Sequence, residues 1–333
     1  MTSQSPRNIL VTGGAGFIGS HLVDKLLERG DRVTVLDNFN DFYSAQIKRA
    51  NIEQHLAQTN YRLIEGDLRD DKALDAAYLN APFDIIVHLA AMAGVRPSLE
   101  QPALYMDVNV RGTQNVIDYT LKHCPQARFV FGSSSSVYGG NRDGDSFKET
   151  DRVDRPFSPY AASKAANELQ CFATHHTTKM QFVCLRFFTV FGPRQRPDLA
   201  IHKFAAKIDK GETIEVYGDG TSKRDYTYVS DIVQGVQGAM EADLPSGFEI
   251  INLGRSEPVV LMDMIKSIEK ALGKEARITH KPFQTGDVPY TYASIEKARQ
   301  LLGYDPKTPL DEGVKHFVDW YRARLDTRLP LRP

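Results

Sequence analysis

Cysteine is scarce in this sequence, with three residues among 333. Cys124, Cys171 and Cys184 are too widely spaced to indicate a disulfide framework or a metal-binding pattern. The nine histidines also lack the spacing of metal ligands, so we expect no bound metal. A chain with so few thiols fits a reducing compartment, and we therefore expect a cytoplasmic protein.

An excess of charge of one sign is also missing, because 41 Lys and Arg residues nearly balance 42 Asp and Glu residues. Basic residues never occur in runs longer than two, so we expect neither nucleic acid nor an anionic membrane as a partner. No stretch approaches the roughly 18 apolar residues that a membrane span needs. Together these absences favour a soluble globular protein that acts on a small molecule.

What the sequence does contain is a regular alternation of two patterns. Short, almost wholly apolar runs at 8–12, 32–37, 61–65, 85–89, 128–132 and 182–186 alternate with amphipathic stretches at 17–29, 71–78, 104–122 and 161–177. Strands that are apolar on both faces are typical of a parallel sheet covered by helices. We therefore expect an α/β fold, namely a Rossmann-type doubly wound parallel sheet with a smaller C-terminal α/β lobe.

The alternation becomes looser after about residue 192, where polar loops separate short strands from expected helices at 231–242 and 261–272. This change predicts a cofactor-binding and catalytic domain at 1–190 and a mainly substrate-binding lobe at 191–333. The chain is free to cross back to the first domain. No flexible linker separates the two parts, so we expect a ligand in the crevice between them.

Three glycines, Gly13, Gly16 and Gly19, lie between the first expected strand and the first expected helix. Glycine lets the backbone approach a pyrophosphate, and a helix N-terminus offers unpaired N–H groups and a favourable dipole. Asp37 ends the second strand about 18 residues later, where it would accept both ribose hydroxyls of NAD and repel the extra phosphate of NADP. Asp67 follows the third strand, where two interpretations stand: contact with adenine, or capping of the next helix.

A second informative segment is Tyr160-x-x-x-Lys164, because residues four apart share one face of a helix. A lysine ammonium one turn away lowers the pKa of a phenol and makes it usable as an acid and base near neutrality. The segment 133–136 consists of four serines, and we expect Ser134 to bond the reacting sugar oxygen beside Tyr160. A solvated helix face is the alternative for Tyr160 and Lys164 taken alone.

These motifs, together with His88-Leu89-Ala90-Ala91 and Arg186-Phe187-Phe188-Thr189, resemble the extended short-chain dehydrogenase/reductase family over nearly the whole chain. The resemblance implies a nucleotide-sugar enzyme with NAD as its cofactor. It assigns cofactor binding to Gly13, Gly16, Phe17, Ile18, Gly19, Asp37, Asn38, Asp67, Leu68, Leu89, Ala90, Ala91, Asn109, Tyr160 and Lys164. Asn109 is equally suited to bracing the active site.

Within that family, the resemblance implies a shared first step in which Tyr160 takes the proton of the sugar 4-hydroxyl while hydride leaves C4. Family dehydratases and UDP-glucuronate decarboxylases then use carboxylates placed just before the Val-Tyr-Gly motif. Ser135 and Ser136 stand at those positions here, and a hydroxyl cannot replace a carboxylate acid/base. The expected reaction is therefore 4-epimerisation, with the hydride returned to the opposite face of the sugar.

The substrate is the last question, and the sequence is similar to UDP-glucuronate 4-epimerases around Asp37–Tyr43, Ala91–Ser98 and Gly286–Pro289. UDP-glucose 4-epimerases usually have Asn in place of Thr189 and Arg in place of Gln284. Neutral hydroxyls suit a C5 carboxylate that must rotate, whereas a fixed arginine fork would hold it in one pose. The residues expected to bind the substrate are Arg96, Ser134, Ser135, Ser136, Thr189, Arg196, Ala200, Tyr217, Arg224 and Asp287.

Three alternatives to this function stay open. A UDP-glucose/UDP-galactose 4-epimerase is the nearest, a UDP-glucuronate decarboxylase is more distant, and a non-catalytic NAD-binding scaffold or sensor belongs to a different class. Relatives without catalysis usually lose the Tyr or the Lys, and both are present here. The family commonly dimerises through two helices of each subunit, so we expect a homodimer formed by the helices near 104–122 and 161–177.

Overall fold

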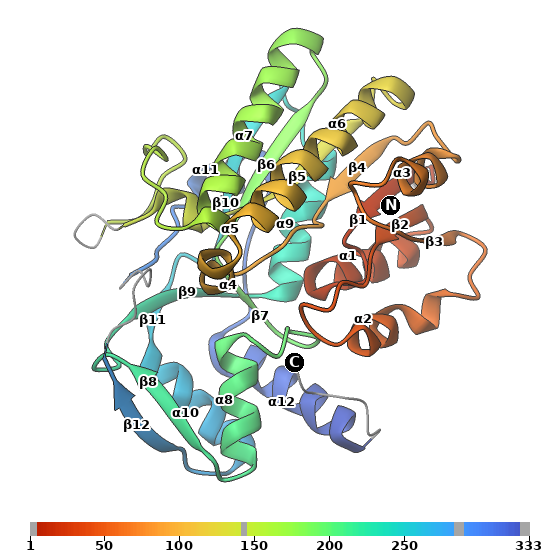
Figure 1. Cartoon of the computed structure of the whole chain (residues 1–333). Coiled ribbons are helices and arrows are strands. Elements are labelled where there is room, and N and C mark those ends of the chain that lie inside the picture. Colours follow the sequence, from red (N-terminus) through yellow and green to blue (C-terminus); the bar gives the residue numbers. More distant parts are fainter. Residues whose placement is uncertain (1–4, 141–144, 283–289, 327–333) are drawn as a thin grey trace.

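A seven-stranded, wholly parallel sheet organises the protein in a computed structural model that describes residues 5–140, 145–282 and 290–326 (Figure 1). The strand order β10-β6-β5-β4-β1-β2-β3 is that of a doubly wound fold, as expected. The strands of this sheet are β1 (Asn8–Thr12), β2 (Arg32–Asp37), β3 (Tyr61–Glu65), β4 (Ile85–His88), β5 (Arg128–Ser134), β6 (Phe182–Phe187) and β10 (Phe248–Leu253).

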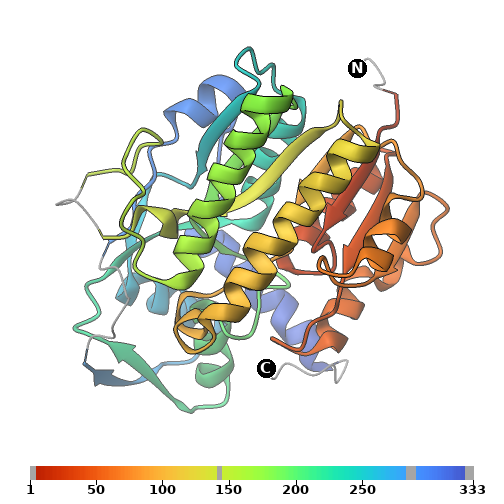
Figure 2. The ribbon, with the colours of Figure 1, turned by 45° about the horizontal axis from the view of Figure 1, so that its top comes forward.

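Apolar side chains cover both faces of the central strands, which explains why these runs form a buried parallel sheet. In β1, Ile9 and Val11 join the hydrophobic core on one face, and Leu10 joins the core on the other. The first core includes residues of α1 (Phe17–Glu28) and α9 (Val229–Glu241). The second includes residues of α3 (Asp71–Tyr78), α6 (Gly112–His123) and α7 (Pro159–Thr178). Figure 2 shows α6 and α7 side by side on this second face.

Further helices join or flank these layers. They are α2 (Ala45–Ile52), α4 (Val95–Glu100), α5 (Pro102–Tyr105), α11 (Glu296–Leu302) and the 3₁₀ turns η1 (Glu53–His55) and η3 (Ser135–Tyr138). The direction in which successive strands are added to the sheet reverses between β1 and β4. The loops after these two strands therefore run to opposite sides of the sheet and leave a crevice at its carboxyl edge. A ligand site is expected in that crevice.

A smaller lobe lies below the sheet in the view of Figure 1 and has its own core. Two parallel strands, β8 (Thr213–Tyr217) and β12 (Arg277–Lys281), lie against the helices α8 (Ala200–Asp209), α10 (Leu261–Leu272) and α12 (Leu310–Asp326). A second small sheet consists of the strands β11 (Pro258–Val260), β9 (Lys223–Tyr228) and β7 (Thr189–Phe191). The chain returns to the large sheet at β10, which pairs with β6.

One expected helix differs from the structure. The stretch 104–122 is divided into α5, a π-helical turn η2 (Met106–Arg111) and α6. The wider turn carries Asn109, whose buried side chain donates to Met92 O at 3.0 Å and to Ser163 Oγ at 2.9 Å. Hydrophobic periodicity does not reveal such an insertion, because π-turns arise from local contacts and often lie at functional sites.

Within the residues that the structure describes, no helix combines the length and apolar character needed to cross a bilayer.

Candidate active site

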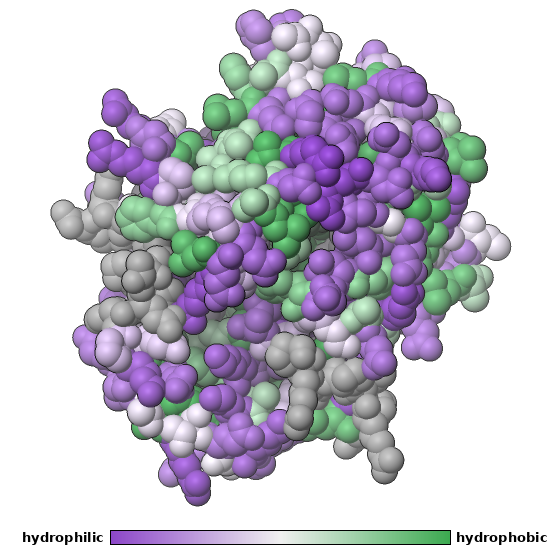
Figure 3. Space-filling view, in the orientation of Figure 1, coloured by the Kyte–Doolittle hydropathy of each residue, from purple (hydrophilic) through white to green (hydrophobic). Residues whose placement is uncertain are grey.

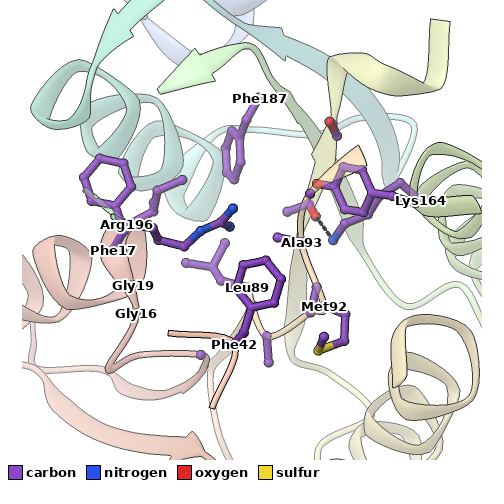
Figure 4. A pocket seen from close by; sticks show the side chains of 18 of the residues that line it. Gly16, Phe17, Gly19, Phe42, Leu89, Met92, Ala93, Lys164, Phe187 and Arg196 are labelled. Atoms are coloured by element: carbon purple, nitrogen blue, oxygen red, sulfur yellow. Dashed lines mark hydrogen bonds between the residues drawn. The ribbon is translucent and has the colours of Figure 1, made fainter. Parts of the chain in front are cut away.

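A cavity of about 550 Å³ lies along the carboxyl edge of the large sheet. Residues directly after β1, β2, β3, β4, β5 and β6 line it, and the first residues of the smaller lobe form the opposite wall. In the close view of Figure 4, Gly16, Phe17 and Gly19 lie at one end, while Lys164 lies at the other. The cavity therefore brings the two sequence motifs into one site.

The glycine segment forms the tight turn that its spacing predicted. Gly13 has a φ of +72°, and a Cβ there would lie 2.7 Å from Ala90 N, so glycine is required at this position. The turn is closed by the N–H of Gly16, which donates to Gly13 O at 3.1 Å. Gly16 provides no side-chain cap, which leaves the first N–H groups of α1 available to a phosphate.

Asp37 occupies the end of β2 and is almost completely buried at the cavity wall. Its carboxylate accepts from Ala15 N at 3.1 Å and from Phe39 N at 2.9 Å. Burial raises the pKa of Asp37, while the nearby Lys48 ammonium acts in the opposite direction. The fixed carboxylate can accept hydrogen bonds from two ribose hydroxyls and would repel the additional phosphate of NADP, which favours NAD.

Asp67 lies beside this ribose end of the cavity. Hydrogen bonds from Arg69 lower its pKa to about 2, and Asn38 Nδ2 donates to it at 3.0 Å. The helix cap that was the alternative for Asp67 is provided by Asp70, which accepts from Lys72 N at 3.0 Å at the start of α3. Asp67 therefore does not cap α3, and its contact with adenine stays a prediction.

Tyr160 and Lys164 lie one turn apart on α7, which begins where Ser158 Oγ accepts from Ala161 N at 3.1 Å. Lys164 Nζ donates to Gly132 O at 2.7 Å and lies 4.7 Å from the centre of the Phe131 ring. Both side chains reach the cavity. The alternative of a solvated helix face does not apply to this pair, because Lys164 is only 4% exposed.

The charges at this end of the cavity explain how Tyr160 can work as an acid and base. Burial lowers the pKa of Lys164 to about 8 and raises the pKa of Tyr160. A hydrogen bond with Ser134 and the positive charge of Arg196 both act to lower the pKa of Tyr160. An ionised Tyr160 therefore depends on positive charge nearby and on the Ser134 hydroxyl.

The serine hydroxyls at the end of β5 and in η3 make different hydrogen bonds. Ser134 Oγ accepts from Ser136 N at 3.2 Å and from Ser136 Oγ at 2.9 Å, which places a chain of hydroxyls beside Tyr160. Ser133 Oγ instead donates to Glu168 at 2.6 Å. Ser135 also lines the cavity. Ser134 thus lies beside Tyr160, and its contact with the reacting sugar oxygen stays a prediction.

Thr189 and Arg196 also line the cavity. Arg196 extends into the cavity from the side of Phe17, facing the end where Lys164 lies (Figure 4). Its guanidinium makes two hydrogen bonds to the Asp198 carboxylate, at 2.9 and 2.8 Å, and lies 5.1 Å from the centre of the Phe42 ring. Asp198 therefore holds this cation in one orientation.

Most of the residues expected from the sequence meet in this cavity. Those that line it are Gly13, Gly16, Phe17, Ile18, Gly19, Asp37, Asn38, Asp67, Leu68, Leu89, Ala90, Ala91, Ser134, Ser135, Ser136, Tyr160, Lys164, Thr189, Arg196 and Arg224. Four others do not: Asn109, Arg96, Ala200 and Tyr217. Arg96 lies 5.1 Å from the ring centre of Tyr217, and these two face each other from different lobes. Asp287 and Gln284 lie outside the described residues.

Sequence reasoning missed several residues of the cavity wall. Tyr43 and Lys48 lie near Asp37, and Lys48 Nζ donates to Asn40 O at 2.7 Å. Tyr43 is buried, and its hydroxyl has no hydrogen-bond partner among the described residues. Family resemblance included Tyr43 in a motif but gave it no role, and no spacing rule connects the helix α2 to the glycine turn.

No group of three or more His, Cys, Asp or Glu side chains suited to holding a metal occurs in the part of the chain that the structure describes. The absence of a metal stays a prediction.

A doubly wound sheet with a glycine turn at β1 and a Tyr160–Lys164 pair at the crevice defines the class of extended short-chain dehydrogenases/reductases. Residues 10–317 match the family described as GDP-mannose 4,6 dehydratase, and the chain belongs to this family.

Relatives within this family carry more specific names. UDP-glucuronate 4-epimerase 2 of Arabidopsis thaliana is 40% identical over 94% of this chain and 75% of its own. The crystal structure of UDP-glucuronic acid 4-epimerase from Bacillus cereus, in complex with UDP-glucuronic acid and NAD, is 34% identical, with a TM-score of 0.89 over 95% of this chain and 99% of its own. UDP-glucose 4-epimerase from Thermotoga maritima, solved with UDP-glucose, is 31% identical, with a TM-score of 0.86 over 96% and 99%. The fold is thus common to epimerases of both substrates.

Proposed function

We propose that the protein is an NAD-dependent UDP-glucuronate 4-epimerase, which interconverts UDP-glucuronate and UDP-galacturonate. One observation carries the choice of epimerisation over dehydration and decarboxylation. Among the described residues that line the cavity, the carboxylates are Asp37 and Asp67, and both lie at the adenosine end. The positions around Tyr160 offer hydroxyls instead, so no carboxylate among the described residues is placed to remove a proton from C5 of the sugar.

The residues of the chain divide the work of such a reaction. Tyr160 removes the proton of the sugar 4-hydroxyl and returns it to the 4-oxygen after the sugar has turned over. Lys164 supplies the positive charge that favours the ionised Tyr160, and Ser134 donates to or accepts from the same oxygen. Bound NAD would supply the reversible hydride transfer at C4 of the sugar. Gly16, Asp37 and Asp67 would hold it along the sheet edge.

The residue environment also supports a sugar acid as substrate. A C5 carboxylate in this cavity would meet the hydroxyls of Ser134, Ser135, Ser136 and Thr189, which can exchange hydrogen bonds as the ring turns. Arg196 would not hold this carboxylate in one pose, because its guanidinium already makes two hydrogen bonds to the Asp198 carboxylate. Arg224, which lines the cavity from β9, and Asp287 are assigned to the uridine diphosphate.

The test is to incubate the purified protein, without added cofactor, with UDP-glucuronate and separately with UDP-glucose, and to identify the products by NMR. UDP-galacturonate from the first alone is the expected result. UDP-galactose from the second would mean that Thr189 does not exclude the neutral sugar. A pentose product would show decarboxylation, and the absence of any product with and without NAD would favour a binding protein.

Thr189→Val tests the carboxylate contact directly. Valine keeps the size of the side chain but loses the hydroxyl, so an unmet buried carboxylate oxygen should lower kcat/KM for UDP-glucuronate by about tenfold. Any residual rate with UDP-glucose should change less. Thr189→Ser is the matched control, since it keeps the hydroxyl, and steady-state kinetics of both variants provide the measurement. Equal losses on the two substrates in Thr189→Val would contradict the assignment.

We also propose that the protein is a cytoplasmic homodimer. All three cysteines are buried and unpaired, which suits a reducing compartment. On α7, Leu169 is 68% exposed and Phe172 is 51% exposed, and the exposed Leu99 and Met106 belong to α4 and η2 at the same side of the fold. In Figure 3, hydrophobic atoms follow the course of α7 between hydrophilic areas. Large apolar side chains gathered on paired helices are typical of a subunit interface.

Sedimentation analysis can test the dimer. We expect the double variant Leu169→Glu/Phe172→Glu to sediment as a monomer at concentrations where the unmodified protein sediments as a dimer, because two charges in an apolar interface are costly. Leu79→Glu is the control, since Leu79 is also strongly exposed but follows α3, away from α7. Dissociation by the control, or none by the double variant, would argue against this interface.

A further inference from the structure

The carboxylate of Glu168 is enclosed between α7 and two strands of the large sheet. Glu168 follows Lys164 by one helical turn and is almost completely buried. Its Oε1 accepts from Ser133 Oγ at 2.6 Å and from Arg186 Nε at 2.9 Å, and its Oε2 accepts from Arg186 Nη2 at 2.7 Å. A single carboxylate thus joins the catalytic helix to the end of β5 and to β6.

Arg186 continues this network towards the cavity wall. Its guanidinium lies 4.6 Å from the centre of the Tyr138 ring, and Tyr138 Oη donates to Asn252 Oδ1 at 2.7 Å. Asn252 Nδ2 donates to Phe147 O at 3.0 Å, and Phe147 lines the cavity. Polar contacts therefore run without a break from α7 through β6 to β10 and the cavity.

Stability alone is a weak reason for such a pair. Removing two buried charges from water is costly, and apolar side chains of similar volume often stabilise a core equally well. The position of the pair is more informative. Ser133, which Glu168 holds, is the neighbour of Ser134, and Ser134 forms the hydrogen bond with Tyr160.

We propose that Glu168 is a positioning residue for the reaction: its carboxylate fixes α7 against the end of β5, and its negative charge sets the pH range in which Tyr160 is ionised beside a charged Lys164. This inference rests on the acid/base roles given to Tyr160 and Lys164 in the proposed function. Glu168 touches neither the cavity nor a substrate, so it acts through Lys164, Ser133 and Arg186.

The charges around Lys164 support the electrostatic part. Burial lowers the pKa of Lys164 to about 8, and Glu168 acts in the opposite direction. Burial also lowers the pKa of His88 to about 3 and raises that of the Cys184 thiol, so both are neutral near pH 8. In the part of the chain that the structure describes, the titratable and charged groups around Tyr160, Lys164 and Glu168 are Cys171 on α7, Tyr105 on α5, His88 on β4, Tyr138 on η3, Cys184 and Arg186 on β6, and Arg196. Glu168 provides the negative charge of this set.

The decisive variant is Glu168→Gln, which keeps the size of the side chain and removes its charge. Loss of a negative charge makes proton loss easier for both Tyr160 and Lys164. The acid limb and the alkaline limb of the pH profile of kcat should therefore both move to lower pH, by about one pH unit. Glu168→Asp keeps the charge but shortens the reach, so it should lower kcat while leaving both limbs in place. KM should change less than kcat in both variants.

Val183→Ala is the matched control for simple loss of stability. Val183 lies on β6, is completely buried and belongs to the core on the sheet face opposite α7. Its pH profile should equal that of the unmodified protein. If Glu168→Gln lowers thermal stability but keeps the pH profile unchanged, its role is structural and the proposal is overturned. Should Glu168→Gln fail to fold, Glu168→Gln/Arg186→Met removes both charges together and should give a smaller shift in the same direction.

A readout that does not require turnover separates this inference from the proposed function. The ionisation of Tyr160 can be followed by near-ultraviolet difference absorbance, comparing each protein with its Tyr160→Phe counterpart. Earlier ionisation in Glu168→Gln supports the inference even if no UDP-sugar is epimerised, whereas unchanged ionisation in an active epimerase overturns the inference alone.

Discussion

Replacement of Tyr160 by Phe is expected to lower kcat by about 10²–10⁴-fold, because it removes the group that exchanges a proton with the sugar 4-oxygen. The aromatic ring remains, and so does its edge-to-face contact with Tyr105, in which the two ring centres lie 6.2 Å apart. The cavity should therefore keep its shape. KM for the UDP-sugar and the affinity for NAD should change only slightly. Product formation measured by NMR, together with a titration of NAD, separates the chemical step from binding.

Tyr304→Phe is a suitable control for this prediction. Tyr304 is buried, and its hydroxyl donates to Gly254 O at 3.0 Å, away from the cavity. Its loss should lower stability without lowering kcat comparably. Near-normal turnover in Tyr160→Phe would remove Tyr160 from the mechanism, and with it the explanation of why Lys164 and Ser134 lie beside it.

Gly19→Ala is expected to have the second large effect, on cofactor binding. A Cβ at Gly19 would lie 2.2 Å from Gly13 O and 2.9 Å from Gly14 Cα, and both are backbone atoms that no side-chain rotation can move. The glycine turn would have to shift away from α1. A strain of this kind costs about 1–3 kcal/mol, which corresponds to an NAD affinity roughly 5- to 150-fold weaker.

The matched control is Gly303→Ala at the end of α11. Gly303 has a φ of +62°, so alanine is strained there, but a Cβ would meet no atom within 4 Å. Both variants should unfold at a lower temperature, while only Gly19→Ala should lose NAD. The NAD content of the purified proteins and calorimetric titration with NAD give the comparison. Full retention of NAD by Gly19→Ala would contradict the assignment of the glycine turn to the pyrophosphate.

Hydrophobic pattern predicted six of the seven strands of the large sheet, but β10 was not predicted. The run around Ile9 is apolar on both faces, and burial on both faces is what a central parallel strand requires, so its bounds agree with β1. The helix expected at 104–122 was less well predicted. Its periodicity contains no sign of the π-turn around Asn109, because that turn depends on a contact with Ser163, which lies 54 residues later in the chain.

In the site, too, local patterns could be predicted and long-range contacts could not. Residues tied to local motifs, such as Gly13 and Tyr160, could be found by spacing, since a turn or a helix face fixes their geometry. Glu168 and Arg186 could not be paired, because strand β6 and helix α7 meet only in the folded sheet. Arg96 and Tyr217 illustrate the opposite case: both were expected to bind substrate, but they contact each other and do not line the cavity, so their role stays a prediction.

The return of the chain to the large sheet has a consequence for biosynthesis. Strand β10 is synthesised about sixty residues after β6, yet β6 pairs with it along its whole length, from Phe182 to Phe187. Until then β6 is an open edge that displays unpaired backbone groups, and α9, made between the two strands, must first cover one face. Contacts between such distant residues form slowly. A chain released near residue 190 would therefore present an unpaired strand edge next to the future catalytic centre, which favours aggregation.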